Sequence, residues 1–525
     1  MPRLHKSKIT NPFHAIQDRG LHNPNYMKYP DLEEGYSRWK GRTLKGFDVD
    51  LRSQLFHDEE RESVVERYWT HCVAGLENEE PILFRFESEE REKIGPLSIQ
   101  QPWSDRVSTA EFYWKRRRWS PKFDALNRAL NDVRSLAPAS GIIPLSVDSA
   151  VEGLPKRKFS GLPFFKTFVS PPHDYISRAA AARKGDYIHI LPAVLGWRGQ
   201  AHGPAKSDTS QRVLWMMDKL DAIISARYLY PLLDVLRKRE EFVAWNDLGV
   251  VDAVVRSAIG RNNNVEDIYS SDFSSFDASI GTYLIEEVFS IISSWFDVVE
   301  SDLEVLKRGF IGCDLLVPDE IWQGRNGGVP SGSGFTNLVD TLVNIIAAKY
   351  VGYALGVEHK FGTYLGDDSV NIWGTSPDSI EVSEALADLG LTAHADKQFI
   401  SKTHVHYLQN VYSAEMHGTR PVMRFLQGAL SYERLKDPKK WSHSMASVRT
   451  LMQLENCKNH PRFANLVSLT KQGDVYLSQY RANALFTMAG GPSKVDEALG
   501  RDVFQYTSWG TRKPSKLAVA YFLGY

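Results

Sequence analysis

Hydrophobic residues recur at three- and four-residue spacing in four long stretches of the chain, which is the pattern of helices with one apolar face. These predicted helices cover Arg212–Glu240, Ile280–Val299, Phe335–Leu355 and Ser379–Leu389. Short runs of β-prone residues between them predict strands over Glu266–Asp272, Thr363–Trp373 and His404–Tyr412. Helices and strands that alternate in this way indicate an α+β protein.

The composition is that of an ordinary globular protein. Of 525 residues, 42 % are hydrophobic and 24 % charged, which excludes disordered and collagen-like classes and leaves room for about three domains. The three cysteines, Cys72, Cys313 and Cys457, are too widely separated for a disulfide framework or a cysteine-rich zinc site, so a reducing, intracellular setting is expected. Residues 1–20 lack the apolar core of a signal peptide, and the apolar stretch 339–357 carries polar and charged residues that argue against a membrane span.

The net charge of −1 hides an uneven distribution of charge along the chain. Residues 58–92 contain twelve Asp/Glu and four Lys/Arg, whereas residues 153–212 contain ten Lys/Arg and three Asp. A further run, Trp114–Trp119, places four cations between two indoles, which either offer stacking planes to bases or pack inward and leave only the arginines in solvent. We therefore expect a basic channel for a polyanion inside a neutral protein.

Two aspartates lie at a predicted strand-to-helix junction. Asp272 ends the predicted strand, and Asp277 follows five residues later, shortly before the helix that begins near Ile280. Side chains at such a junction converge on one place. The alternative is that an Asp at this position caps the following helix, which is a frequent role for this residue.

The segment Tyr364–Ser369 contains Gly-Asp-Asp between two β-prone runs, which predicts the tight turn of a hairpin. Turn chemistry alone explains a single Gly-Asp pair. Two adjacent carboxylates, Asp367 and Asp368, nevertheless repel each other unless a cation lies beside them. With Asp272 they would supply the hard oxygen ligands that Mg²⁺ prefers.

A glycine-rich loop, Gly327–Thr336, precedes the long predicted helix, and its glycines let the backbone approach a ligand closely. On that helix Thr336, Asp340 and Asn344 are four residues apart and share one face. Polar groups on a largely apolar helix are costly to bury unless they meet a ligand or a partner. The alternative is a narrow solvated face.

The combination and order of these three motifs are more specific than any one of them. Asp-x4-Asp at 272, Ser-Gly-x3-Thr at 331 and Gly-Asp-Asp at 366 resemble motifs A, B and C in the palm of viral RNA-dependent RNA polymerases. The three segments Ser271–Asp277, Pro330–Asn337 and Tyr364–Ser369 are most similar to picobirnavirus polymerases, with partitivirus polymerases next. The core resemblance covers residues 160–428.

The resemblance implies which residues form the catalytic centre. Asp272, Asp367 and Asp368 correspond to the ligands of two Mg²⁺ ions, for which Mn²⁺ can substitute. The residues that correspond to the ribose-reading group are Asp277, Ser331 and Thr336. The family carries Asn nine residues after the motif serine, where this chain has Asp340, with Asn337 and Asn344 nearby. The group that reads the 2′-hydroxyl therefore stays open among them.

The resemblance also implies basic residues over the incoming triphosphate, ahead of the first motif. The candidates are Arg198, Lys206 and Arg212, of which Arg212 is the best match. Guanidinium groups clamp phosphate oxygens bidentately, which favours arginine at such a position. The alternative for Arg198 and Lys206 is a solvated surface position.

Further segments resemble other family motifs. The expected RNA contacts are Ser160, Gly161 and Pro163 of the template-entry motif, together with Gly332. Lys397 matches the motif D lysine, a proposed proton donor to pyrophosphate, and its alternative is an ordinary exposed lysine. Tyr407–Asn410 resembles motif E, the hairpin that supports the primer end.

By resemblance, the fold is a closed right hand around an antiparallel palm sheet. The implied parts are an N-terminal extension bridging fingers and thumb at 1–69, fingers at 70–262 and 301–326, a palm at 263–300 and 327–415, and a thumb with a C-terminal tail at 416–525. The implied partners are RNA template and product, NTPs and a viral capsid protein, without a membrane. The expected location is the interior of a virus particle in the host cytoplasm, with primer-independent initiation.

Two rival functions remain at this stage. A reverse transcriptase shares a palm with paired aspartates, but Gly366 before the pair and the Ser-Gly-x3-Thr loop favour an RNA polymerase. A non-catalytic RNA-binding or particle-structural protein with a relic palm is the second rival, and the intact Asp272, Asp367 and Asp368 argue against it.

Overall fold

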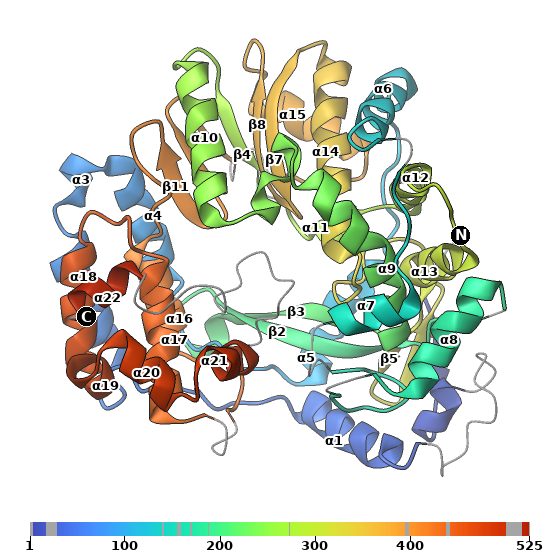
Figure 1. Ribbon diagram of the computed structural model, residues 1–525, viewed down its shortest axis with the longest axis horizontal. Helices are drawn as coiled ribbons and strands as arrows, with labels where there is room; N and C mark the ends of the chain where they lie inside the picture. The colour runs from blue at the N-terminus through green and yellow to red at the C-terminus, as the bar shows by residue number, and fades with distance from the viewer. Residues whose placement is uncertain are drawn as a thin grey trace.

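The computed structural model describes residues 4–16, 29–138, 141–154, 159–168, 171–186, 188–271, 273–393, 398–436, 441–499 and 517–523. Two predicted site residues, Asp272 and Lys397, lie outside these ranges. The described strands form sheets of five, four and two strands, surrounded by helices (Figure 1). The predicted α+β class is therefore confirmed.

A four-stranded antiparallel sheet carries the Gly-Asp-Asp sequence. Its order is β7 (His359–Leu365), β8 (Asp368–Trp373), β4 (Ile268–Ser271) and β9 (Phe399–Ser401). Leu365 pairs with Asp368, so β7 and β8 form a hairpin with a two-residue turn, as the sequence predicts. Ser271, the last residue of β4, pairs with Ser369 beside that turn.

A second sheet lies opposite the first in Figure 1. Its order is β1 (His5–Lys8), β6 (Glu320–Gln323), β5 (Leu315–Val317), β2 (Ala193–Ala201) and β3 (Thr209–Met216). The prediction of a helix from Arg212 was wrong for its first residues, because they belong to β3 and the helix α9 begins only at Lys219. The period is the reason: side chains along β3 alternate between buried and more exposed, which suits a half-buried strand.

The helix α14 (Thr336–Leu355) runs through the main hydrophobic core. It packs against α6 (Phe123–Arg134), α12 (Thr282–Ser294) and α15 (Ser379–Asp388), and α12, α14 and α15 match three of the four predicted helices. By length and composition α14 could cross a membrane, but 78 % of its apolar window is buried inside the protein, as in a core helix. The other helices of this part are α1 (Leu32–Lys45), α5 (Trp103–Glu111), α7 (Val147–Gly153), α8 (His173–Lys184), α9 (Lys219–Leu236), α10 (Leu248–Asn262), α11 (Phe276–Ser279) and α13 (Ser301–Gly312).

A second hydrophobic core joins C-terminal helices to an N-terminal segment. The C-terminal helices are α16 (Val422–Leu430), α17 (His443–Glu455), α18 (Phe463–Gly473), α19 (Val475–Gln479), α20 (Ala482–Met488), α21 (Pro492–Leu499) and α22 (Ala518–Phe522). Their N-terminal partners are α2 (Arg61–Tyr68), α3 (Leu76–Glu79) and α4 (Pro81–Glu92). Buried side chains from 55–94 and 422–520 form one cluster, and the two segments lie side by side in Figure 1. Residues 70–94, assigned to the fingers from the sequence, thus pack with the thumb helices.

The first part of the chain contacts both cores. The strand β1 pairs with β6, and Trp39 on α1 donates to the Leu195 carbonyl of β2. Further along, Arg52 pairs with Ser431, and the Phe56 amide donates to the Gly473 carbonyl. The segment before residue 69 therefore reaches the five-stranded sheet and the C-terminal helices, the contacts that an N-terminal bridge requires.

Glu87 on α4 fixes the beginning of α16. Its two carboxylate oxygens accept the amide N–H groups of Val422 (2.6 Å) and Met423 (2.8 Å), where a negative charge favours a helix. Its Oε1 also lies 3.1 Å from Nε2 of His460. The side chains of Glu87 and His460 are both fully buried, so this joint lies inside the second core.

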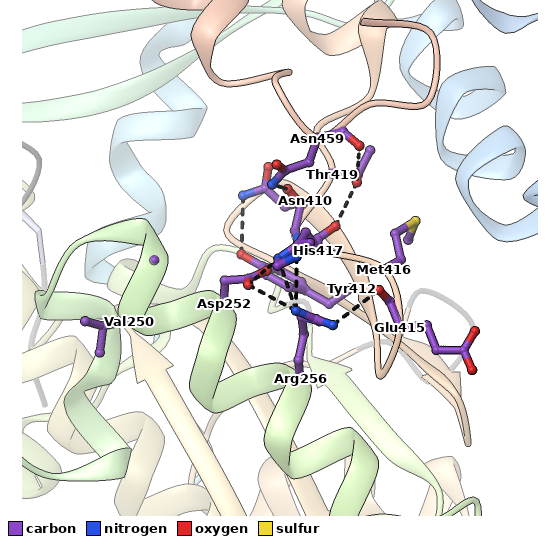
Figure 2. A network of polar contacts seen from close by, with 12 residues as sticks. Val250, Asp252, Arg256, Asn410, Tyr412, Glu415, Met416, His417, Thr419 and Asn459 are labelled. Carbon is purple, nitrogen blue, oxygen red and sulfur yellow. Dashed lines mark hydrogen bonds and ion pairs between the residues drawn. The ribbon is translucent and has the colours of Figure 1, made fainter. Parts of the chain in front are cut away.

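Figure 2 shows a polar network where α10 meets the loop between β11 (Asn410–Ser413) and α16. Asp252 accepts the Gly418 amide (2.7 Å) and lies 2.7 Å from Nδ1 of His417. One turn further, Arg256 donates to two carbonyls of the same loop. Asn459, from the segment before α18, donates to the Gly418 carbonyl (2.9 Å). The network thus ties α10 to the chain that leads into the C-terminal helices.

Candidate active site

The turn between β7 and β8 is held by α14. Gly366 has a φ of +61°, which favours glycine, and its amide donates to Oγ1 of Thr341 (2.9 Å). Nδ2 of Asn344 donates to the carbonyls of Gly366 (3.0 Å) and Asp367 (3.1 Å). Both α14 side chains are buried, so they fix the backbone that presents Asp367. The amide nitrogen of Asn344, a predicted nucleotide-binding residue, is thus bonded to the turn.

Three carboxylates from different elements gather at this turn. Asp277 of α11 is largely buried and interacts electrostatically with Asp367 and Asp340. Burial and the charge of Asp367 raise the pKa of Asp277 to about 6. Burial raises the pKa of Asp340 well above its ordinary value, and Asp277 and Asp367 raise it further. Asp340 is 5 % exposed, and its Oδ1 has no hydrogen-bond partner in the described part of the chain. These groups repel one another as the protein stands.

This donor set fits a hard divalent cation. Carboxylate oxygens are the ligands that such ions prefer, and a cation would offset the repulsion among Asp277, Asp340 and Asp367. Asp368 is exposed at the start of β8. Across the described ranges, which omit Asp272, no three acidic, His or Cys side chains are already arranged to hold a metal ion.

Of the three predicted basic residues, Arg212 is the one whose charge acts on Asp277 of this cluster. Its charge opposes the rise in the pKa of Asp277, and its side chain is exposed with Nε bonded to Gln200 (3.1 Å). Arg198 is directly opposite Arg212 on β2 and lies 3.7 Å from Glu433. Two like charges opposite each other on paired strands repel, and the Glu433 carboxylate offsets part of this repulsion at Arg198.

Lys206 is more distant from Arg212 along the strands. It lies in the connection between β2 and β3, where its Nζ forms an ion pair with Asp48 (3.1 Å). The structure thus brings Arg198 and Arg212 together and places Lys206 beside the N-terminal segment.

The glycine-rich loop lies directly on β3. Oγ of Ser331 donates to the Val213 carbonyl (3.2 Å) and accepts the Trp215 amide (3.3 Å). A Cβ on Gly332 would lie 1.9 Å from the Trp215 carbonyl oxygen, so no other residue fits there without movement. Oγ1 of Thr336 donates to the carbonyl of Pro330 (2.7 Å). The two predicted hydroxyls thus shape the loop.

The predicted template-entry turn lies against the end of the same strand. Gly161 has a φ of +57°, and a Cβ there would lie 2.9 Å from the Met216 carbonyl oxygen. Ser160, Gly161 and Pro163 are all buried, and the exposed side chains of this turn include Phe159 and Lys166. The strand β3 therefore supports Arg212, the glycine-rich loop and this turn.

In the basic run Trp114–Trp119, the first indole packs inside the protein and does not offer a stacking surface. Trp114 is 8 % exposed, and its Nε1 donates to the Gln323 carbonyl (2.8 Å). Arg117 also turns inward, and its Nη2 and Nε donate to the Ala278 carbonyl (2.6 and 2.9 Å), next to Asp277. The inward alternative holds for Trp114, while Arg117 is less exposed to solvent than that alternative assumed.

The remaining motif positions are partly described. Tyr407 and Asn410 pair across the hairpin of β10 (His404–Tyr407) and β11, as motif E predicts, and Tyr407 is buried. Sequence reasoning missed Thr341, although it lies three residues before Asn344 on α14. It also missed Asp221, whose signal is a lone acid in the apolar run 220–226.

An antiparallel sheet whose hairpin turn presents aspartates, faced by arginines on a second sheet, is the arrangement of a nucleotide-polymerizing right hand. The geometry therefore defines the class before any relative is considered.

Comparison with known proteins gives the family. Residues 207–427 match the family model of viral RNA-dependent RNA polymerase. A potential RNA-dependent RNA polymerase of Human picobirnavirus (strain Human/Thailand/Hy005102/-) is 26 % identical over 481 residues, covering 86 % of this chain and 88 % of that protein. The RNA-directed RNA polymerase of Cryptosporidium parvum virus 1 (strain KSU-1) is 29 % identical over 363 residues, covering 62 % of this chain and 66 % of that protein.

Solved structures agree on the fold. The crystal structure of a human picobirnavirus RNA-dependent RNA polymerase has a TM-score of 0.80 at 21 % identity, covering 98 % of this chain and 99 % of that chain. Its insertion loop deletion mutant has a TM-score of 0.77 at 22 % identity, covering 91 % and 99 %. The right-hand fold predicted from the sequence is confirmed.

Residues 207–427 thus match a viral RNA-directed RNA polymerase, the enzyme class predicted from the sequence, and the predicted resemblance to picobirnavirus polymerases is confirmed. Enzymes of this class act on an RNA template and NTPs and use divalent metal ions.

Proposed function

We propose that this chain replicates and transcribes a double-stranded RNA genome by two-metal nucleotidyl transfer with Mg²⁺. The observation that carries the proposal is the convergence of Asp277, Asp340 and Asp367 near Arg212. Phosphoryl transfer depends mainly on positioning and on neutralising charge, which carboxylate-bound cations and arginines provide.

The metal-binding residues in this proposal are Asp272, Asp367 and Asp368. Asp272 directly follows Ser271, which pairs with Ser369, the residue after Asp368. Asp272 itself lies outside the described residues, so its assignment rests on the resemblance of its sequence motif. When bound, two Mg²⁺ ions, or Mn²⁺ in their place, activate the attacking 3′-hydroxyl and stabilise the leaving pyrophosphate. The aspartates hold and space that charge.

Asp277 and Asp340 read the ribose in this proposal. The partnerless Oδ1 of Asp340 is an acceptor at a buried position, where a 2′-hydroxyl can donate to it. The hydroxyls of Ser331 and Thr336 already bond within or beside the glycine-rich loop, so they shape the pocket. Asn344 supports the same pocket by holding the turn.

Basic residues complete the nucleotide site in this proposal. Arg212 and Arg198 bind the triphosphate, whose negative charge offsets the repulsion between these two cross-strand neighbours. Lys206 contributes positive charge from the tip of the same hairpin, and Lys397 donates a proton to the pyrophosphate. The template strand passes Gly332 and the turn at Ser160, Gly161 and Pro163, mainly through phosphates and 2′-hydroxyls.

Initiation, partner and location are proposed from the resemblance. Synthesis begins without a primer, and the enzyme works inside a virus particle in the host cytoplasm, held by a viral capsid protein. The domain limits stated from the sequence are part of the same proposal, with residues 55–94 packed on the thumb.

The test is RNA synthesis by the full chain on single-stranded RNA with four NTPs. Product is expected with Mg²⁺ and without a primer, and chelation of the metal with EDTA should abolish it. Replacing NTPs by dNTPs should reduce the product strongly. Equal use of dNTPs would instead indicate a reverse transcriptase, and RNA binding without synthesis would indicate a non-catalytic protein.

A further inference from the structure

A buried carboxylate on α9, Asp221, holds the glycine-rich loop through two hydrogen bonds. Oδ2 of Asp221 accepts the hydroxyl of Ser333 (2.8 Å), and Oδ1 accepts the amide of Gly334 (2.8 Å). Asp221 is fully buried. One rigid side chain therefore holds two consecutive residues of the loop through both of its oxygens.

The loop approaches β3 and α9 very closely at two of its glycines. A Cβ on Gly334 would lie 2.5 Å from Cβ of Ser225 on α9, just as one on Gly332 would lie 1.9 Å from the Trp215 carbonyl oxygen of β3. β3 ends at Met216 and α9 begins at Lys219, so the two supports are one continuous piece of chain. The loop is pressed flat against this β3–α9 unit, and Asp221 is its polar anchor.

The anchored loop leads directly into the helix that carries the active-site groups. Oγ of Ser333 also accepts the Phe335 amide (3.2 Å), and α14 begins at the next residue. α14 carries Asp340 and holds the turn of Asp367 through Asn344. The other side of the anchor, β3, carries Arg212. Asp221 thus links the triphosphate side of the nucleotide site to its ribose and metal side.

Burying a carboxylate at this position costs folding free energy, which suggests that its bonds to the loop serve a function. Burial and the nearby Asp218 together raise the pKa of Asp221 to about 7, although the bonds from Gly334 and Ser333 oppose the rise. Asp218 is itself paired with Arg178 (2.7 Å). Within the described ranges no ion pair includes Asp221, so the loop's donors compensate for its burial.

We propose that Asp221 is a positioning residue that sets the distance between the triphosphate-binding arginines and the ribose-reading carboxylates. It acts through Ser333 and Gly334 and does not touch the substrate. Its effect on nucleotide choice rests on the function proposed above, whereas its hold on the loop does not. The two parts are therefore tested separately.

The hold on the loop is measured by hydrogen exchange of the full chain, without substrate. Asp221→Ala removes both acceptors, and exchange of the Gly334 amide is expected to rise by about tenfold or more. Asp221→Asn keeps one acceptor and should give a smaller rise. Ser333→Ala removes one bond and tests the same contact if Asp221→Ala does not fold. Unchanged exchange in the folded variants overturns the proposal.

A matched control lies in the thumb. Asp474 is buried, and its Oδ1 accepts the hydroxyl of Ser447 (2.7 Å) and the amides of Tyr476 (3.0 Å) and Leu477 (3.1 Å). Asp474→Ala therefore removes the same chemistry far from the loop. It should leave the exchange of residues 331–336 as in the wild type, and a rise there would mean that any buried aspartate acts on the loop.

The effect on nucleotide choice is measured as the ratio of kcat/KM for an NTP to that for the matching dNTP. This ratio does not depend on how much of the enzyme is active, so a merely destabilised variant leaves it unchanged. Asp221→Ala should lower the ratio by about tenfold and raise KM for the NTP, because a displaced loop no longer positions the ribose against its reading groups. Asp221→Asn should recover part of both, and Asp474→Ala should change neither.

The outcomes separate the two proposals. Wild-type enzyme that makes no RNA counts against the proposed function, while the exchange experiment still decides whether Asp221 holds the loop. Active wild-type enzyme together with a folded Asp221→Ala variant of unchanged ratio and KM overturns the positioning role alone.

Discussion

Two buried carboxylates show how differently the palm and the thumb treat negative charge. Glu87, between α4 and the thumb helix α16, has both oxygens bonded to backbone amides and His460 beside it. Asp340, on the palm helix α14, has an oxygen without a partner in the described chain and two other carboxylates nearby. The joint at Glu87 is satisfied within the protein, whereas Asp340 keeps an acceptor oxygen that a ligand could use in the function proposed above.

The difference teaches which carboxylates serve stability and which serve the reaction. A satisfied buried group contributes to folding, and its removal leaves its partners unpaired. A group surrounded by like charge disfavours folding, so its presence is explained by a ligand. Each of the following predictions acts on one side of this contrast.

The largest expected effect is on the palm side. Asp367→Asn should lower RNA synthesis by about a thousandfold or more, because a ligand of both cations loses its charge. RNA binding should persist, and the thermal midpoint should not fall, since repulsion on Asp277 and Asp340 is relieved. Primer extension and filter binding on the same preparation measure both, and a fully active variant would contradict the metal assignment.

On the thumb side the effect should be on stability instead. Glu87→Ala leaves two amides and His460 unpaired, and should lower the free energy of unfolding by about 2–5 kcal/mol. Glu90 on the same helix forms more exposed pairs with Lys93 and Arg424, so Glu90→Ala should cost less than about 1 kcal/mol. Denaturant unfolding compares the two. If both variants lost the same free energy of unfolding, the buried contacts of Glu87 would contribute no more to stability than the more exposed ion pairs of Glu90.

Substitutions of Asp340 should change both stability and nucleotide preference, each by less than the substitutions of Glu87 and Asp367 change stability and RNA synthesis. Asp340→Asn removes one of three like charges but keeps a polar acceptor, so we expect a higher thermal midpoint without metal and continued RNA synthesis. Asp340→Leu removes the acceptor, and should lower the preference for NTPs over dNTPs by about tenfold. Steady-state incorporation of both nucleotides checks this, with Asp474→Ala as the control. An unchanged preference in Asp340→Leu would assign the ribose to Asp277 alone.

The smallest expected effect is a pH dependence from Asp277. Its pKa is about 6 in the folded protein against an ordinary 3.8, so the folded state binds this proton more tightly than the unfolded chain does. The resulting contribution to stability is complete below about pH 4 and is lost as the pH rises to about 6. Without metal, wild type should lose stability relative to Asp277→Asn across that window. A difference that stays constant with pH would contradict the shift.

The palm was predictable from the sequence because its signals are local. Gly366 and the adjacent aspartates mark a turn between two β-prone runs, and the helix over 336–355 follows from its apolar period. The contacts between these elements could not be predicted from the sequence. The hold of Asn344 on the turn depends on a helix and a hairpin meeting, and the partnerless oxygen of Asp340 depends on what does not reach it.

The thumb was largely unpredictable because its key contacts join distant parts of the chain. Glu87 and Val422 are 335 residues apart, and nothing near either residue in the sequence indicates the other. The acidic run at 58–92 indicates a negative charge but not which part of the chain it contacts, although its apolar residues belong to the second core. The strand at Arg212–Met216 was missed for a related reason, since its pairing with β2 outweighs a local pattern that also suits a helix.

The pairing of β1 with β6 has a consequence for how the chain is made. Residues 5–8 are synthesised long before residues 320–323, with which they pair. The apolar residues of 55–94 wait longer, because their core is closed by helices that extend to residue 520. The strands of the four-stranded sheet are all present by residue 401. A nascent chain therefore assembles its palm while its earliest segments are still exposed, and these need protection from aggregation until the last helices emerge.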